Sequence, residues 1–207
     1  MLQIDDLFMY DKISNPEFEL ITEGPYEIDE VKIDEDDVIF DIGAHVGIFS
    51  CIGAAKGKTV YAFEPCSELI PEIKKQSALY DNRIIPVETA LSDHVGTASY
   101  KIADSQGMLV SQINDDDNTE SVNVTTIDEF VRTNNIEKVD FIKADIEGAE
   151  RNMLRGAAET LKKYAPKLAI CTYHLPDDKE VLENIVKEAN PNYNIIHRYK
   201  KMYCWVD

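Results

Sequence analysis

The chain is poor in basic residues: 21 lysines and arginines stand against 39 aspartates and glutamates, which gives a formal net charge of −18. A field of that sign repels polyanions on average, so we expect no nucleic-acid partner. Apolar runs are also short, and none approaches the ~20 residues that a transmembrane helix needs. We therefore expect no transmembrane segment, and we interpret the acidity as an aid to solubility.

Cysteines are few and widely separated, and they show neither C-x-x-C nor zinc-site spacing. Three of the four lie in apolar stretches, where cysteines are typically reduced core residues. They are Cys51, Cys66, Cys171 and Cys204. The first residues of the chain carry acids where a signal peptide needs positive charge. Together these absences predict a cytoplasmic location.

What the sequence does contain is an apolar run, residues 38–42, that leads into a turn with glycines at Gly43 and Gly47. A continuous apolar run is typical of a parallel strand that is covered on both faces. Glycines let the backbone turn tightly and approach a ligand at the start of the next helix. Glu64 ends the following apolar run, 21 residues after Gly43 (64 − 43), where an acid can accept hydrogen bonds from ribose hydroxyls. This pattern predicts a site for a nucleoside-containing cofactor.

The spacing of the glycines distinguishes between such cofactors. A dinucleotide site favours G-x-G-x-x-G, whereas this turn reads Asp41-x-Gly43-x-x-x-Gly47, with His45 in place of the second close-approach glycine. An acid at the end of the first strand also suits a cationic ammonium group better than a pyrophosphate. The turn therefore favours S-adenosylmethionine over NAD. The alternative without a ligand is a doubly wound domain whose first turn merely contains glycines.

Strand and helix patterns alternate along the rest of the chain. We expect strands over 38–42, 59–63, 84–87, 139–144 and 167–173, and helices over 47–55, 71–82, 127–133, 149–164 and 178–189. The last two strands, 193–197 and 202–206, are close enough in sequence to pair antiparallel. This order predicts an α/β fold of the Rossmann-like class I methyltransferase type. Its sheet would be seven-stranded and mostly parallel, with an antiparallel C-terminal strand and helices on both faces.

Two parts fall outside this alternation. Residues 1–36 precede the first strand and should form a cap or extension beside the cofactor cleft, while residues 37–207 should form a single domain. An insertion of about residues 96–126 interrupts that domain, and within it residues 97–102 and 122–125 are expected to pair as a hairpin. Thr126-x-x-Glu129 then forms a capping box that opens the next helix.

A second concentration of polar residues follows the fourth expected strand. Asp145 and Glu147 should emerge at the carboxyl edge of the sheet, where open α/β sheets bind ligands, and His174 ends the fifth strand. Helix capping by the two acids is the structural alternative. Side chains of these types can take a proton from a hydroxyl nucleophile, which makes the three residues our catalytic candidates. They are also a reasonable ligand set for a divalent metal, although sequence spacing alone does not establish one.

With these motifs the chain resembles the FkbM-type S-adenosylmethionine-dependent methyltransferases over about residues 24–200. The matching segments are Val38–Gly47, Ala62–Pro65, Ala90–Gly96, Val124–Asp128, Leu154–Ala157, and above all Val139–Glu150, which contains Lys-x-Asp-x-Glu-Gly-x-Glu. The strand that ends at His174 extends the match. One departure is His45, where the family more often carries asparagine.

The resemblance implies roles for individual residues. The methionine end of the cofactor would be held by Asp41 and the turn residues Gly43, Ala44, His45 and Gly47. Glu64, followed by Pro65, would hold the ribose, Thr89 and Ala90 would flank the adenine, and Asp145 would line the methyl-transfer end.

Members of this family mostly methylate hydroxyl oxygens. The expected acceptor is therefore a hydroxyl on a sugar, a polyketide or a lipid-linked glycan. Transfer to nitrogen or carbon remains an alternative, because methyltransferases that act on different atoms share the cofactor-binding half of the fold. A nicotinamide-dependent oxidoreductase and a non-catalytic adenosylmethionine-binding protein are the alternatives from other classes.

Overall fold

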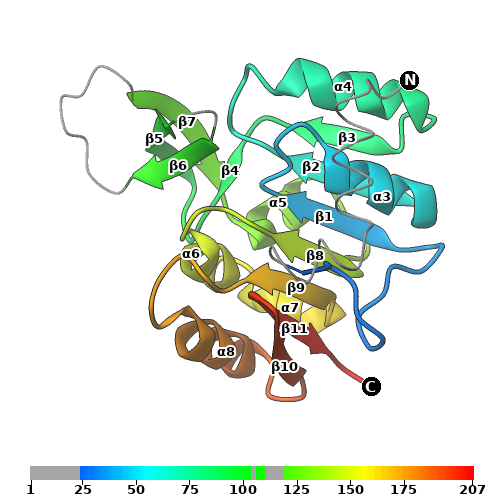
Figure 1. Ribbon diagram of the computed structural model, residues 1–207, viewed down its shortest axis with the longest axis vertical. Coiled ribbons are helices and arrows are strands. Elements are labelled where there is room, and N and C mark those ends of the chain that lie inside the picture. Colours follow the sequence, from blue (N-terminus) through cyan, green and yellow to red (C-terminus); the bar gives the residue numbers. More distant parts are fainter. Residues whose placement is uncertain (1–23, 104–105, 111–118) are drawn as a thin grey trace.

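The structure is a computed structural model that describes residues 24–103, 106–110 and 119–207. Its centre is a seven-stranded sheet in the order β10-β11-β9-β8-β1-β2-β3 (Figure 1). The strands are β1 (Val38–Ile42), β2 (Thr59–Phe63), β3 (Ile84–Val87), β8 (Phe141–Ala144), β9 (Lys167–Cys171), β10 (Asn194–Arg198) and β11 (Lys201–Trp205). Neighbours are parallel except that β11 runs antiparallel to both β9 and β10. The predicted fold and its antiparallel C-terminal pair are confirmed.

Two apolar cores cover the two faces of this sheet. Alternate residues of β1 point to opposite faces, so that Ile39 joins the core beneath α3 and α4 while Phe40 joins the core beneath α5 to α8. The helices are α3 (Ile48–Lys56), α4 (Ile70–Leu79), α5 (Ile127–Thr133), α6 (Glu150–Arg155), α7 (Ala158–Tyr164) and α8 (Asp178–Ala189). Because both faces are covered, the central strands are apolar on both sides, which is what made them recognisable in the sequence.

The helix expected over 149–164 is in fact two helices, α6 and α7, which are separated at Gly156. A Cβ atom on Gly156 would lie 2.1 Å from the carbonyl oxygen of Ser92, so another part of the chain passes against the backbone here. Asp128, in α5, accepts hydrogen bonds from the amides of Glu159 (3.0 Å) and Thr160 (2.8 Å) and so caps α7. The break thus depends on contacts that are distant in sequence, which helical periodicity cannot reveal.

A second sheet has four strands, of which three lie in the part of the chain predicted as an insertion and one, at residues 90–91, precedes it (Figure 1). Its order is β4-β7-β5-β6, from β4 (Ala90–Leu91), β5 (Gly96–Ala103), β6 (Gln106–Val110) and β7 (Thr119–Thr125). The expected pairing of 97–102 with 122–125 corresponds to the antiparallel pair β5 and β7. Strand β6, on the other side of β5, was not predicted. The Thr126 hydroxyl accepts from the Glu129 amide at 2.9 Å, which confirms the cap of α5.

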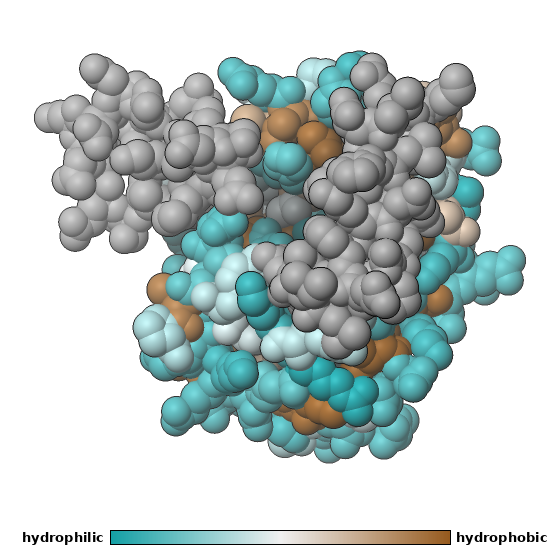
Figure 2. Space-filling view, viewed as in Figure 1, coloured by the Kyte–Doolittle hydropathy of each residue, from teal (hydrophilic) through white to brown (hydrophobic). Residues whose placement is uncertain are grey.

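Polar residues dominate the described part of the surface in the view of Figure 2, in keeping with the charged composition. No described helix is both long enough and apolar enough to cross a bilayer. All four cysteines are buried with free thiols.

Candidate functional site

The carboxyl ends of β1 and β8 meet at the centre of one sheet edge. These strands are neighbours, with Asp41 opposite Lys143, and the Asp145 amide donates to the Ile42 carbonyl at 3.1 Å. Gly43 lies so close to the next strand end that a Cβ atom would come within 2.1 Å of the Asp145 carbonyl oxygen. The two motifs found in the sequence are therefore in contact at the point where open α/β sheets bind ligands.

Every second residue of the glycine turn has a left-handed backbone conformation: φ is 76° at Gly43, 51° at His45 and 87° at Gly47. Glycine adopts this conformation at little cost, and histidine, like asparagine, is enriched there among residues with side chains. The amides of Gly43 and Ala44 both donate to the Phe63 carbonyl, at 3.1 and 3.0 Å, which ties the turn to the end of β2. The shape of the turn is therefore set by the residue types that tolerate a positive φ and by the two hydrogen bonds to Phe63.

Asp41 is fully buried beneath this turn. Its carboxylate lies 3.0 Å from the Lys143 ammonium and accepts a 2.6 Å hydrogen bond from the Ser50 hydroxyl. Burial favours a lower pKa for Lys143, but the carboxylates of Asp41 and Asp145 outweigh it and hold that pKa above its ordinary value. The ammonium also donates to the Gly43 carbonyl at 2.7 Å. Asp41 thus contacts the turn through Lys143, and its expected direct contact with the methionine ammonium stays a prediction.

Glu64, at the tip of β2, joins two turns. One carboxylate oxygen accepts from the His45 amide and the other from the Cys66 amide, both at 2.9 Å, and the residue is 5% exposed. Burial raises the pKa of Glu64, and the two amide hydrogen bonds offset only part of that effect. Each oxygen keeps a second lone pair, which is the acceptor capacity that a ribose diol would use. Pro65 follows, half-buried.

The expected adenine-binding residues follow β3 and begin next to Glu64. The amides of Glu64 and Thr89 both donate to the Val87 carbonyl, at 3.1 and 2.9 Å. Thr89 is half-buried, whereas Ala90 is buried in a small core that includes Cys66 and Val124. Their position beside the ribose candidate is compatible with the assigned role, which stays a prediction.

The catalytic candidates form one cluster at the same edge. The imidazole of His174 lies with its Nε2 atom 3.5 Å from both Asp145 Oδ1 and Glu147 Oε2. Asp145 also accepts hydrogen bonds from the hydroxyls of Tyr26 (2.9 Å) and Tyr173 (3.2 Å). Burial favours a higher pKa for Asp145, but the charge of Lys143 and the Tyr26 hydrogen bond outweigh it and lower that pKa.

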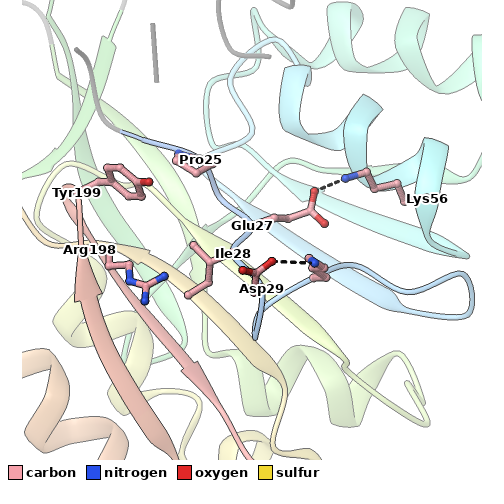
Figure 3. Close-up of a pocket in the computed structure, with 8 residues that line it drawn as sticks. Pro25, Glu27, Ile28, Asp29, Lys56, Arg198 and Tyr199 are labelled. Atoms are coloured by element: carbon pink, nitrogen blue, oxygen red, sulfur yellow. Dashed lines mark hydrogen bonds and ion pairs between the residues drawn. The ribbon is translucent and has the colours of Figure 1, made fainter. Parts of the chain in front are cut away.

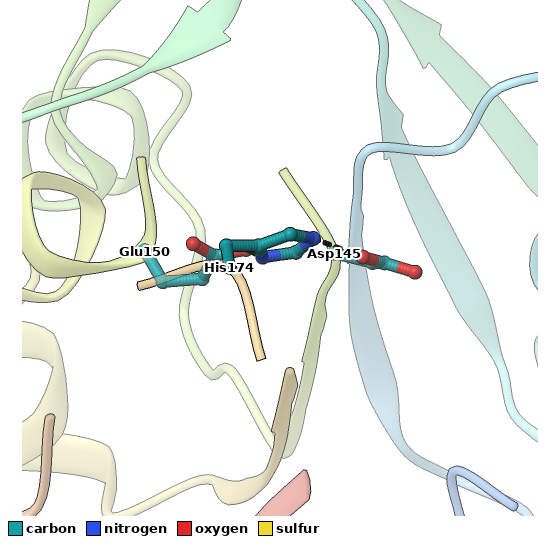
Figure 4. A group of neighbouring side chains, drawn as sticks. All are labelled: Asp145, Glu150 and His174. Carbon is teal, nitrogen blue, oxygen red and sulfur yellow. Dashed lines mark ion pairs between the residues drawn. The ribbon is translucent and has the colours of Figure 1, made fainter. Parts of the chain in front are cut away.

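Glu150 is a member of this cluster whose role the sequence left undecided. Its carboxylate is fully buried, accepts from the amides of Ile146 (2.8 Å) and Gly148 (2.9 Å), and lies 3.0 Å from His174 Nδ1. Burial favours a lower pKa for His174, but Glu150, followed by Asp145 and Glu147, outweighs it and raises that pKa. Figure 4 shows the imidazole between Glu150 and Asp145. Glu150 thus fixes both the turn and the ring.

Two tyrosines of the site were missed by sequence reasoning. Tyr26 belongs to the segment before β1, and its ring lies 5.4 Å from the Lys143 ammonium and 4.3 Å from that of Lys201. Tyr173 precedes His174 in the loop after β9. A glycine-proline turn signal marks the place of Tyr26, but no local pattern links it to Asp145, 119 residues away.

A separate cavity of about 360 Å³ lies beside the segment before β1 (Figure 3). None of the predicted site residues lines it. Charged residues on its wall pair with one another, Lys56 with Glu27 and Lys32 with Asp29. Arg198 also lines the cavity, which therefore differs from the acidic cluster around His174 in containing more basic than acidic side chains.

Comparison with known proteins places these features in a family context. The family described as Methyltransferase FkbM domain matches residues 41–195. The chain is 27% identical over 158 residues to the hexuronic acid methyltransferase AglP of Haloferax volcanii, an alignment that covers 75% of this chain. The same alignment covers 64% of the relative, so this chain spans less than two thirds of its length.

Solved structures give the same fold. The methyltransferase FkbM of Methylobacillus flagellatus KT matches with a TM-score of 0.67 at 21% identity, over 93% of this chain and 50% of that one. Fibrillarin of Aeropyrum pernix, solved with natively bound S-adenosyl-L-methionine, matches with a TM-score of 0.52 at 10% identity, over 96% and 76% of the two chains. These likenesses show a Rossmann-like class I methyltransferase fold.

Proposed function

Because this chain belongs to the FkbM methyltransferase family, we propose that it transfers a methyl group from S-adenosylmethionine to a hydroxyl oxygen of a sugar. The observation that carries the proposal is the contact between the glycine turn and the strand end that bears the cluster around His174. Gly43 touches the Asp145 carbonyl, so a cofactor over the turn would present its methyl group to that cluster. Adjacency of this kind is what a direct transfer requires.

The described residues fit this cofactor. Left-handed glycines shape the turn, Glu64 offers acceptor atoms to a ribose, and Thr89 and Ala90 follow on the side assigned to adenine. When bound, S-adenosylmethionine supplies a methyl group on a sulfonium, which is a good leaving group. Asp41 and Lys143 would act from below by holding the Gly43 carbonyl in place.

The protein's own contribution is to align the acceptor and to remove its proton. The bound cofactor would supply the methyl carbon to the acceptor oxygen, and the electron pair of the broken carbon–sulfur bond would stay on sulfur. The hydroxyl proton passes to the cluster of Asp145, Glu147 and His174, in which Glu147 is the most exposed carboxylate, at 33%. Alignment of the reactants can contribute about 7–11 kcal/mol to the rate, and proton transfer a further ~10²–10⁴-fold.

A sugar is the acceptor class that the comparisons favour, since the curated relative is named for hexuronic acid. A hexuronic acid offers both hydroxyl and carboxylate oxygens. Because three carboxylates already surround His174, they would repel a carboxylate nucleophile, and we assign the transfer to a hydroxyl. Polyketides and lipid-linked glycans belong to the same hydroxyl-bearing class, and transfer to nitrogen or carbon is not favoured.

Further parts of the proposal concern the surroundings of the site. Of the expected cap, residues 1–23 lie outside the described residues. Residues 24–36 would cover the cleft, which is supported by the hydrogen bond from Tyr26 to Asp145. The four free cysteines support a cytoplasmic location. The net charge of −18 supports the exclusion of nucleic acid as a partner.

A labelled-methyl assay with paired acceptors tests this function. We expect protein and methyl-labelled S-adenosylmethionine to label an aryl glucuronide, and also the matching aryl glucoside, which lacks the carboxylate. The label should survive mild alkali, because methyl ethers resist the hydrolysis that cleaves methyl esters. Each methyl transferred should be matched by one S-adenosylhomocysteine.

Two results would contradict the assignment. Alkali-labile label on the glucuronide alone would show esterification of its carboxylate. Absence of label from a broad panel of glycosides, with label appearing on an amine acceptor instead, would remove the sugar hydroxyl as the substrate.

A further inference from the structure

The starting point is the second ring nitrogen of His174. The side chain is 6% exposed, and Nε2 is buried without a hydrogen bond to any described residue. Its nearest oxygens, on Asp145 and Glu147, are each 3.5 Å away, which is longer than the 2.7–3.2 Å of N–H···O bonds. A buried polar atom in this state needs an additional partner to offset the loss of water.

The other nitrogen, Nδ1, also lacks a hydrogen bond to a described residue but forms an ion pair with Glu150. Glu150 is fully buried and anchored by the amides of Ile146 and Gly148, and its Oε1 atom lies 3.0 Å from His174 Nδ1. Histidines that bind metals usually donate their other N–H to a carboxylate, which sets the tautomer and the ring orientation. Here the fixed carboxylate faces Nδ1, so Nε2 would carry the lone pair.

The atoms around Nε2 have the spacing of ligands that share one ion. Two ligand atoms at right angles, each about 2.1–2.4 Å from an ion, are about 3.0–3.4 Å apart. The separation of Nε2 from the Asp145 and Glu147 oxygens is 3.5 Å in both cases, so shifts of a few tenths of an ångström would suffice. Among the described residues, the group whose potential ligand atoms all lie within 4.8 Å of one another is Asp145, Glu150 and His174 (Figure 4), so Glu147 would have to move toward Asp145 for the two carboxylates and Nε2 to share an ion.

We propose that His174 Nε2, Asp145 and Glu147 bind a divalent cation, with Glu150 as the carboxylate that orients the imidazole. Three protein ligands leave coordination positions open on a six-coordinate ion. Two carboxylates and one imidazole are a mixed oxygen and nitrogen set that suits Mg²⁺ or Mn²⁺.

The role of the ion rests on the proposed methyl transfer. An acceptor hydroxyl in an open position would lose its proton more readily, as metal-bound water does, and would be held in line with the methyl group. The binding of the ion itself is independent of that reaction and can be measured without cofactor or acceptor.

Manganese binding provides the test. We expect the chelator-treated, dialysed protein to bind about one Mn²⁺ per chain, measured by the loss of the free-ion electron paramagnetic resonance signal, and Mg²⁺ to compete. Glu147→Gln and His174→Gln should each weaken this binding at least tenfold. The matched control is Glu159→Gln at an exposed position of α7, which should not change the affinity. Far-ultraviolet circular dichroism checks that each variant is folded.

The possible outcomes distinguish the cation site from the proposed methyl transfer. No Mn²⁺ binding above the weak background of an acidic surface, or binding that folded Glu147→Gln and His174→Gln retain in full, would overturn the cation site. Methyl transfer that persists in protein shown to be metal-free would overturn the ion's role in the reaction while leaving the proposed function intact. Site-specific Mn²⁺ binding without any methyl transfer would instead support the cation site and contradict the proposed function.

Discussion

Replacing Lys143 by methionine should destabilise the fold by about 3–5 kcal/mol, because it leaves the Asp41 carboxylate buried without its counter-charge. Asp41 is 0% exposed, and the Ser50 hydroxyl is its remaining hydrogen-bond donor from a side chain among the described residues. Urea denaturation followed by circular dichroism measures the loss. The matched control, Lys58→Met, removes an exposed lysine and should change stability by less than about 0.5 kcal/mol.

A double variant keeps this prediction testable if Lys143→Met does not fold. Asp41→Leu combined with Lys143→Met removes both charges, and replacing a whole buried pair by apolar residues is often neutral. We therefore expect the double variant to be more stable than Lys143→Met alone. A single variant as stable as the wild type would show that the pair is not the buried, coupled unit described here.

His174→Gln should reduce the rate of methyl transfer at least about 100-fold while leaving the dissociation constant of S-adenosylmethionine within about twofold. The expectation follows from the position of the imidazole, which contacts the acidic cluster and none of the residues assigned to the cofactor turn. Single-turnover rates and calorimetry measure the two quantities separately.

The control for this variant is His94→Gln, because His94 is exposed in the loop between β4 and β5. It should keep the wild-type rate. If His174→Gln also kept more than half of that rate, His174 would have no catalytic role, and the transfer chemistry would have to be assigned to other residues.

The fold could be predicted largely from local patterns. Buried parallel strands such as β1 and β8 are continuous apolar runs, and short loops force the last two strands to pair. The division of α6 from α7 at Gly156 could not be predicted, because it reflects a close approach to Ser92, 64 residues earlier (156 − 92). Strand β6 was missed as well: its segment, QGMLV, lies in the insertion, outside the alternation of apolar strands and helices.

The clustering of the candidate residues was predictable, whereas their individual contacts were less so. Parallel strands bring their carboxyl ends together, so Asp145, Glu147 and His174 were expected to be neighbours, and the structure places them so. Whether Asp41 faces a ligand or the interior depends on which face of β1 bears it and on the register with Lys143, which appears only once the strands are paired. The roles of Glu150 and Tyr26 likewise depend on contacts across the fold.

Calorimetric titration of S-adenosylmethionine and of NAD into the protein, with Glu64→Gln beside the wild type, tests the central claim most directly. We expect S-adenosylmethionine to bind and NAD not to bind. Glu64→Gln should weaken that binding by roughly 10- to 150-fold, the ~1.5–3 kcal/mol of a charged hydrogen bond, whereas Glu68→Gln at an exposed position should not. Binding of NAD without S-adenosylmethionine, or equal affinity of folded Glu64→Gln and wild type, would contradict the assignment of this sheet edge as the cofactor site.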